Sequence, residues 1–184
     1  MADNRDVARK VERQMEEKQF DERVLHIDRV ARVVKGGRRF RFRALVAVGD
    51  HKGRIGVGSA KGPDVTSAVT KATDVAKKKM VKVNLYKETL PHEALAKVSG
   101  AQIMIKPASL GTGLIAGGVV RTVLEITGVR NVLSKSFGSS NRTNMAYATV
   151  AALETLVSSK DWITNNNPSK PKVIKDKKEV AKKD

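Results

Sequence analysis

The side chains that could do chemistry in this chain are mostly basic, and they concentrate in one segment. Residues 29–61 contain ten Lys or Arg side chains and a single acidic one, Asp50. Like charges on a rigid strand repel one another, and a polyanion that neutralises them releases its condensed counterions. This pattern favours binding to the phosphate backbone of nucleic acid over catalysis. The candidate RNA-binding residues are Arg29, Arg32, Lys35, Gly36, Gly37, Arg38, Arg39, Arg41, Arg43, Lys52, Arg54 and Lys61.

The same segment predicts how RNA would be recognised. Gly36 and Gly37 lie in a break between two strand-like stretches, where glycine lets the backbone approach a phosphate closely. Aromatic residues make up 4% of the chain, and Phe40 and Phe42 fall on the side of their strand that is expected to face the core. We therefore expect recognition of the backbone and shape of structured RNA, without stacking of bases on the sheet.

No set of residues has the types and spacing of a catalytic or metal site. The three histidines, His26, His51 and His92, fall in separate parts of the chain without metal-ligand spacing. The scattered acidic residues are more simply explained as helix caps and counter-charges to a basic surface. The chain has no cysteine, which excludes a disulfide, a thiolate zinc site and a cysteine nucleophile. We expect no enzymatic activity, no cofactor and no bound metal.

A glycine-rich stretch offers the one enzymatic alternative. Gly111, Gly113 and Ala116 match the spacing of a dinucleotide-binding fingerprint that follows a strand and opens a helix. About twenty residues further on, where that fingerprint needs an acidic residue for the ribose, the chain has Asn131. Glycines that let a helix pack closely against its sheet or another chain explain the stretch better. A nucleotide-dependent enzyme stays the alternative that a nucleotide-binding assay would detect.

Length and charge describe a basic protein with room for one ordinary domain or two small ones, each with its own core. Its 184 residues carry a formal net charge of +17. Residues 23–160 hold 24 basic and 8 acidic residues, so the charge lies mainly in the part that is expected to fold. No stretch is long and apolar enough for a membrane helix, and the N-terminus lacks an apolar export segment. We expect a cytoplasmic protein that binds nucleic acid and not a membrane.

Apolar periodicity predicts a first domain over 23–86 with the element order βββα. One strand runs from residue 24, a second spans 39–48 with arginines on its polar side, and a third spans 54–58. A helix is predicted over 64–80, because apolar residues recur there every three or four positions. Residues 1–22 have the composition of a charged extension, and residues 87–94 that of a linker.

The second domain is predicted over 95–160 as a β-α-β-α unit. Its first strand stops at Pro107, and its first helix ends at Gly128. Residues 129–137 have the pattern of a strand, and Asn141 follows two serines where a cap for the last helix is expected. The Asn-rich and Lys-rich residues 161–184 are predicted to be disordered. The fold class is therefore α+β.

Three strings carry a resemblance to a known family. They are VKGGRRF at 34–40, VGD at 48–50 with GRIG at 53–56, and PASLGTGLIAGG at 107–118. From about residue 24 to residue 156, the chain resembles the bacterial small-subunit ribosomal protein S-five family. The resemblance implies an N-terminal domain like the double-stranded-RNA-binding fold and a C-terminal α/β domain with a left-handed crossover. Ala60, Thr66 and Arg142 stand where Gly, Pro and Pro are common in the family.

The resemblance also implies a function and partners. It implies a structural constituent of the small ribosomal subunit that binds 16S rRNA near the head and neck through the loop 34–38, to which spectinomycin sensitivity is linked. It implies an interface with ribosomal protein S-four that tunes decoding accuracy beside the mRNA entry path and includes Gly111, Gly113 and Arg121. Protein S-eight would contact the C-terminal domain. A free double-stranded-RNA-binding regulatory protein is the alternative, and its stoichiometry against ribosomal subunits would distinguish it.

Overall fold

The first half of the chain forms an antiparallel sheet with one helix on it. The computed structural model describes residues 20–158. Strands β1 (Asp21–Val34), β2 (Gly37–Gly49), β3 (Arg54–Gly62) and β4 (Val81–Lys82) lie in the order β1-β2-β3-β4, and helix α2 (Val65–Lys78) follows β3. The predicted meander of three strands followed by a helix is confirmed. The two-residue strand β4 was not predicted, because two residues carry too little periodicity.

The start of β1 corrects the boundary of the predicted N-terminal extension. Asp21 and Glu22, assigned from the sequence to that extension, pair with Gly49 and Val48 in the β1–β2 ladder. The carboxylate of Glu22 lies 3.0 Å from Nζ of Lys77 on α2, so its negative charge has a partner within the fold. The rest of the extension, over 1–19, and the tail predicted over 161–184 lie outside the described residues.

Small residues bring α2 close to the first sheet. Ala68, Ala72 and Ala76 of the helix are fully buried, and they pack against apolar side chains of β2. A Cβ atom on Gly58 of β3 would overlap the carbonyl oxygen of Ala72, so only glycine leaves room for the helix backbone there. The helix and β3 therefore approach more closely than any larger residue at this position would allow.

The second half forms a four-stranded sheet with two helices on one face. It contains β5 (Ala94–Val98), β6 (Ala101–Pro107), β7 (Leu114–Ile115), α3 (Gly118–Thr127), β8 (Val132–Gly138) and α4 (Arg142–Glu154). The strand order is β5-β6-β8-β7, and only the β7–β8 pair is parallel. The predicted β-α-β-α order is confirmed for β6, α3, β8 and α4. Strands β5 and β7 were missed.

The ends of the two helices follow the predicted capping chemistry. The backbone of Gly128 has a φ of +94° just after α3, in the left-handed region that favours glycine. The side chain of Asn141 accepts a hydrogen bond of 3.1 Å from the backbone N–H of Thr143 at the start of α4. Both helix boundaries can therefore be read from single residues.

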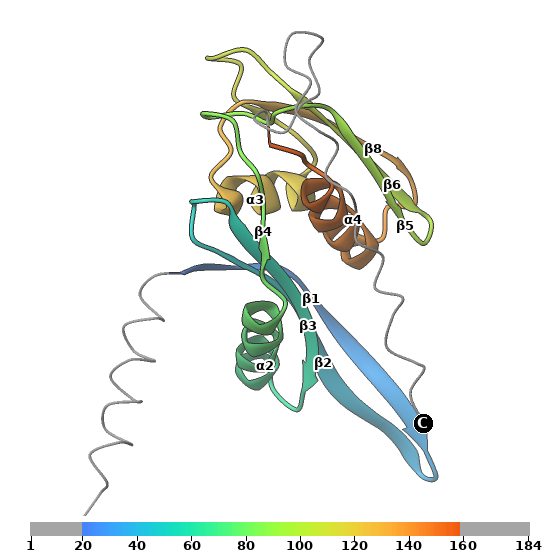
Figure 1. Cartoon of the computed structure of the whole chain (residues 1–184). Helices are drawn as coiled ribbons and strands as arrows, with labels where there is room; N and C mark the ends of the chain where they lie inside the picture. The colour runs from blue at the N-terminus through green and yellow to red at the C-terminus, as the bar shows by residue number, and fades with distance from the viewer. Residues whose placement is uncertain (1–19, 159–184) are drawn as a thin grey trace, which may run out of the picture.

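The larger of the two hydrophobic clusters among the described residues is shared by the two halves. Helices α3 and α4 lie between the second sheet and the first (Figure 1). Leu45, Ala47 and Ile55 of the first sheet join the same buried cluster as Leu124 of α3 and Leu153 of α4. The backbone N–H groups of His51 and Gly53 donate hydrogen bonds of 3.0 Å to the carbonyl oxygens of Ile126 and Thr127. One face of the first sheet is therefore buried by the second half, while its other face forms a cluster of its own with α2.

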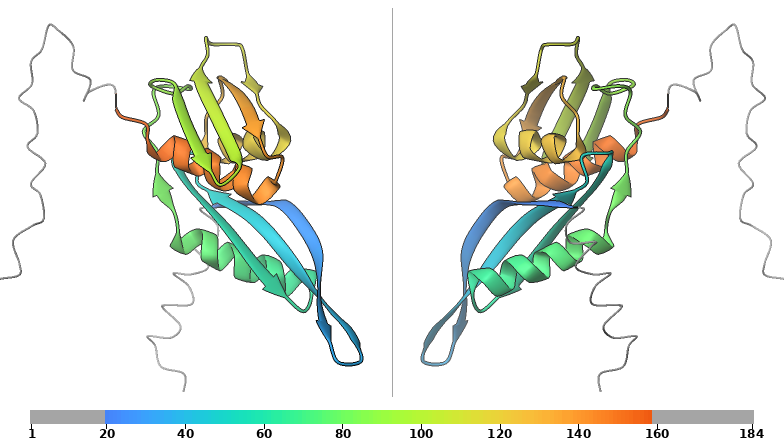
Figure 2. Two further views of the ribbon diagram at one scale, coloured as in Figure 1. Left: turned by 90° about the vertical axis from the view of Figure 1, so that its right-hand side faces the viewer. Right: turned by 90° about the vertical axis from the view of Figure 1, so that its left-hand side faces the viewer.

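The β1–β2 hairpin extends beyond both layers that cover the first sheet (Figure 2). Residues 44–49 of β2 are buried, whereas residues 37–41 are exposed on both sides of the strand. The side chain of Phe40 is 49% exposed and that of Val33 is 78% exposed. Phe40 was predicted to face the core, and this is wrong because no element covers either face of the hairpin so far out. Phe42, two residues nearer the body, is half-buried beside α2.

Candidate nucleic-acid interface

The projecting hairpin presents one sign of charge. Residues 29–43 contain seven Lys or Arg residues and no Asp or Glu. Because directly paired residues of an antiparallel ladder point to the same side, the register assigns each side chain to a face. The pairs Arg32–Arg39 and Val30–Arg41 lie on one face. We call Arg32, Arg39 and Arg41 the arginine face. All three are exposed, and no ion pair involves them among the described residues.

The opposite face of the hairpin has a different chemistry. The pairs Ala31–Phe40 and Arg29–Phe42 lie there. The guanidinium carbon of Arg29 lies 3.9 Å from the centroid of the Phe40 ring, so the charge sits over the negative face of the aromatic system. The hairpin therefore has one face with three exposed arginines and one face where a cation covers an aromatic ring.

Arg43 continues the arginine face toward the body, but its charge is already paired. Its Nε atom donates a hydrogen bond of 3.0 Å to Asp28, and Nε2 of His26 lies 2.7 Å from the same carboxylate. Arg142, at the start of α4, donates to the ring of His26 and so ties the second half to β1. Arg43 was predicted to bind RNA together with Arg39 and Arg41. That contact stays a prediction, and the structure adds that the guanidinium is paired with Asp28, a residue just outside the segment that was counted from the sequence.

The Arg43 cluster gives the protein a defined response to acid. The hydrogen bond from Arg43 lowers the pKa of Asp28 below its usual 3.8, and the hydrogen bond from His26 acts in the same direction. The folded state then binds fewer protons than the unfolded state, so the contribution to stability is present above about pH 4 and is lost as pH falls through the lowered pKa.

This response is tested by Asp28→Asn. The change is expected to lower the free energy of unfolding by up to about 1 kcal/mol near neutral pH, where the pair is intact. The difference from the parent protein is expected to shrink as pH falls below 3.8 and through the lowered pKa of Asp28. Urea unfolding at several pH values measures it. A difference that is the same at every pH would mean that packing, and not charge, is responsible.

The hairpin loop needs glycine for its backbone conformation. Gly36 and Gly37 have φ values of +91° and +150°, and a Cβ atom on either would meet no atom within 4 Å. Crowding therefore does not explain these glycines, whereas the left-handed conformation does. The exposed Lys35 and Arg38 flank them at the end of the hairpin. Close approach of this loop to a phosphate stays a prediction.

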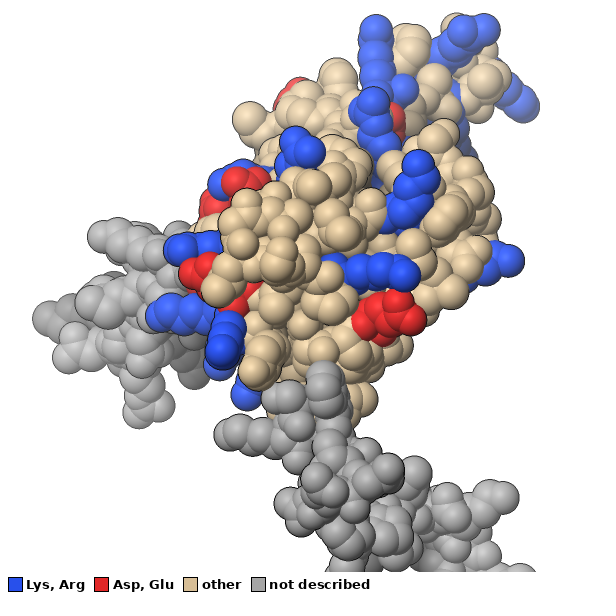
Figure 3. All heavy atoms as spheres, turned by 90° about the horizontal axis from the view of Figure 1, so that it is seen from above, with Lys and Arg blue, Asp and Glu red and all other residues tan. Residues whose placement is uncertain are grey.

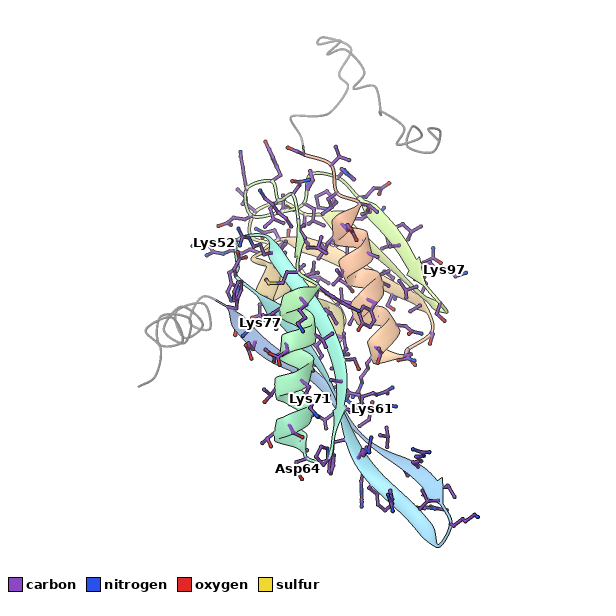
Figure 4. All side chains as sticks on the ribbon, turned by 60° about the horizontal axis from the view of Figure 1, so that its bottom comes forward. Lys52, Lys61, Asp64, Lys71, Lys77 and Lys97 are labelled. Carbon is purple, nitrogen blue, oxygen red and sulfur yellow. The ribbon has the colours of Figure 1, made fainter. Side chains whose placement is uncertain are left out.

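Two of the predicted RNA-binding residues lie far from the hairpin tip. Lys52 and Arg54 lie at the turn between β2 and β3, and Figure 4 shows Lys52 at the end of the sheet that adjoins the second half. β2 has 13 residues, so at about 3.4 Å per residue the two ends lie about 40 Å apart. Arg54 also lies 3.8 Å from the carboxylate of Asp50. Lys61, by contrast, lies opposite Arg43 at the base of the hairpin.

The second predicted interface surrounds the glycine-rich loop before α3. The backbone N–H groups of Gly111 and Gly113 both donate hydrogen bonds of 3.1 Å to Oδ1 of Asn131. Arg121, on the exposed side of α3, lines a cavity of about 680 Å³ together with Leu114, the neighbour of Gly113. The structure therefore brings Arg121 close to the loop that carries Gly111 and Gly113.

Asn131 was noted in the sequence only as a residue that could not bind a ribose, and its structural role was missed. Its side chain is buried, and its backbone oxygen accepts a hydrogen bond of 2.7 Å from Thr89. The available signal was an Asn inside the stretch 129–137 that was predicted as a strand, where Asn is uncommon. Because Asn131 occupies the N–H groups of Gly111 and Gly113, these groups do not form a cradle for a dinucleotide phosphate. This geometry counts against the enzymatic alternative.

Asn131→Ala is expected to destabilise the fold. It would leave two N–H groups of the loop without their acceptor, at a cost of about 2 kcal/mol in the free energy of unfolding. Chemical denaturation measures the loss. Asn84→Ala is the control, because it removes one hydrogen bond from a surface side chain to the carbonyl oxygen of Leu156. Equal losses in the two variants would contradict the role given to Asn131.

The described part of the chain shows neither a metal centre nor a membrane span. Within residues 20–158, no three His, Cys, Asp or Glu side chains are placed to hold a metal ion together. None of the helices described there has the length and apolar character needed to cross a membrane. Seen from above the second half, basic side chains are spread among uncharged ones, and most acidic side chains in view lie beside a basic one (Figure 3).

Comparison with protein families matches both halves of the chain. Residues 20–84 match the family model described as ribosomal protein S5, N-terminal domain, and residues 96–165 match that described as ribosomal protein S5, C-terminal domain. The first match covers the sheet with the hairpin and α2, and the second covers the two-layered half with the glycine-rich loop. Both domains occur in the family's order. The chain therefore belongs to the ribosomal protein S5 family, whose members are structural constituents of the ribosome.

Proposed function

We propose that this protein binds 16S rRNA of the small ribosomal subunit mainly through the β1–β2 hairpin. One observation carries the proposal: the hairpin projects from the body with three unpaired arginines on one face. These arginines are exposed and share one sign of charge, so they can neutralise phosphates on the surface of structured RNA. Membership of the family supports rRNA as the partner.

A second surface is proposed to meet ribosomal protein S-four. The loop with Gly111 and Gly113 is held from inside by Asn131, and Arg121 is exposed beside it. A preformed loop presents a fixed shape to a partner at little entropic cost. This interface would lie beside the mRNA entry path, and through it the protein would influence the accuracy of decoding.

Protein S-eight is proposed to contact the second domain. The outer face of its sheet, opposite α3 and α4, carries the exposed side chains of Leu95, Leu133 and Phe137. These are 55%, 40% and 44% exposed, and the strand register places lysines on the same face, so it offers both apolar and charged groups to a protein partner. This face is therefore the part of the second domain that we propose for S-eight.

Sedimentation tests the proposed function. The full-length chain, carrying a tag, is followed through a sucrose gradient of cell lysate at high salt. Comigration with small subunits at one copy each is expected. A chain that stays in the soluble fractions would favour the alternative, a free double-stranded-RNA-binding regulatory protein. That alternative also predicts sub-stoichiometric and salt-sensitive association with subunits.

Gly113→Asp is expected to disturb the proposed S-four interface more than the fold. A side chain at Gly113 would meet no atom within 4 Å, and the backbone φ of +76° is one that Asp tolerates better than most residues. We expect an unfolding free energy within about 1 kcal/mol of the parent, together with raised decoding error. Gly113→Asn is the matched control, because it has the same shape without the charge. Unchanged error rates and unchanged subunit assembly would count against this interface.

A further inference from the structure

We propose that Arg29 and Phe40 form a stacking site for one unpaired nucleobase of the bound RNA. The inference rests on the proposed function, since it adds a base contact to a hairpin that is already proposed to bind rRNA through phosphates. It reverses the expectation from the sequence that no base would stack on this sheet. That expectation depended on Phe40 facing the core, and Phe40 is 49% exposed.

The geometry builds a flat platform on the phenylalanine side of the hairpin. Phe40 lies opposite Ala31, whose methyl group leaves the ring open, and Arg29 lies two residues away on the same face. The guanidinium carbon is 3.9 Å from the ring centroid, which is the separation of a stacked pair. A planar guanidinium stacks against a nucleobase as readily as it stacks against an aromatic ring. The outer plane of Arg29 is thus positioned for a base.

Arg29 is held by the ring and not by a carboxylate. Within residues 20–158, no ion pair involves Arg29, whereas Arg43 on the other face is bound by Asp28. An arginine fixed over an aromatic ring loses little further freedom when a base stacks on it, so the contact is preorganised. The aromatic ring is therefore the feature that distinguishes Arg29 from the cations of the arginine face.

The chemistry selects an unpaired nucleotide. In an A-form duplex the base faces are stacked on one another and the deep groove is too narrow for side chains, so a stacking platform can be used only by a base in a loop, bulge or junction. Phosphates on either side of that base would meet the arginine face or Arg38. The arginine face of the hairpin would then bind the phosphate backbone of an RNA strand, and the opposite face would bind one base of that strand.

A single tryptophan at the site gives a direct readout. The chain has one Trp, Trp162, which lies outside the described residues, so Phe40→Trp in a Trp162→Phe background has one reporter. The probe is a transcript of small-subunit rRNA. Stacking of a base is expected to quench the fluorescence at position 40. A single-stranded oligonucleotide is expected to quench more than a duplex of the same length at equal occupancy.

The affinity of position-40 variants for RNA, measured with its salt dependence, distinguishes a stacking contact from a charge contact. Phe40→Leu is expected to weaken binding of the transcript roughly 5- to 100-fold at fixed salt while leaving the salt dependence unchanged. Phe40→Tyr is expected to retain binding. Tyr86→Leu removes an aromatic ring of similar exposure outside the hairpin, 45% against 49%, and controls for general loss of exposed aromatic surface. Thermal unfolding of each variant shows whether it still folds.

The outcomes distinguish this inference from the function on which it rests. The stacking site is supported if RNA quenches the tryptophan of the Phe40→Trp protein and if Phe40→Leu, but not its control variant, loses affinity. Unchanged affinity in Phe40→Leu, while loss of the arginine face still weakens binding, overturns the stacking site and leaves the rRNA proposal standing. A parent protein that does not prefer the rRNA transcript over unrelated RNA overturns both. Quenching by a neighbouring ribosomal protein and not by RNA would assign the ring to a protein contact and overturn the inference.

Discussion

Replacing Arg39 and Arg41 by Gln is expected to weaken binding to 16S rRNA about 30-fold near physiological salt. Each phosphate contact contributes about 0.7 to 0.9 to the slope of log affinity against log salt, which corresponds to roughly fivefold in affinity per contact at about 0.15 M. The slope itself is expected to fall by about 2. Both side chains are exposed and lie on one face of a hairpin that no other described element covers, so the fold should be unaffected. Filter binding across a salt series measures both quantities.

The control for this experiment removes the same charge from another surface. Lys71→Gln with Lys78→Gln takes two exposed positive charges from α2. If net charge alone attracted the RNA, this variant and the hairpin variant would lose affinity equally. The account requires the hairpin variant to lose clearly more affinity and more slope. An affinity and a slope equal to those of the parent protein would show that the arginine face does not touch RNA.

Gly58→Ala is expected to lower the free energy of unfolding by about 3 kcal/mol. A Cβ atom at this position would lie 2.6 Å from the backbone nitrogen of Ala76 and would overlap the carbonyl oxygen of Ala72. Backbone atoms of a helix cannot rotate away as a side chain can, so α2 must move off the sheet and disturb the packing of its buried alanines. We expect a fall in the melting temperature of about 10 °C, measured by circular dichroism.

Gly118→Ala is the matched control for Gly58→Ala. Gly118 is the first residue of α3, and a Cβ atom there would meet nothing within 4 Å. Alanine favours the helix, so stability should be unchanged or slightly higher. A small effect at Gly58, comparable to that at Gly118, would mean that the contact between β3 and α2 is looser than the structure has it.

The sequence predicted those elements whose periodicity is uninterrupted over several residues. The alternation in β2 and the helical spacing in α2 and α3 are local properties, and the caps at Gly128 and Asn141 can be seen in single residues. Strand β7 has two residues and is defined by pairing with β8, which lies on the far side of α3 in the sequence. Such pairing depends on tertiary contacts and leaves no local pattern.

The candidate site could be predicted in composition but not in shape. Alternation along β2 placed Arg39 and Arg41 correctly on one side, because side-chain direction follows from the strand alone. It could not show where the covering layers end, so it placed Phe40 in the core. It also could not show that Asp28 pairs with Arg43, or that about 40 Å of strand separates the hairpin tip from Lys52. These facts depend on which elements pack against the sheet.

Directed cleavage of rRNA from the hairpin tip tests the central claim most directly. The chain has no cysteine, so Lys35→Cys provides one attachment point for an iron chelate that releases hydroxyl radicals. The labelled full-length protein is assembled into small subunits, with Lys97→Cys on β5 as the second attachment point. The account predicts strong cleavage of 16S rRNA confined to a few neighbouring segments from position 35, at sites different from those cut from position 97. Cleavage from position 35 no stronger than that from unlabelled protein, in particles that contain the protein, would contradict it.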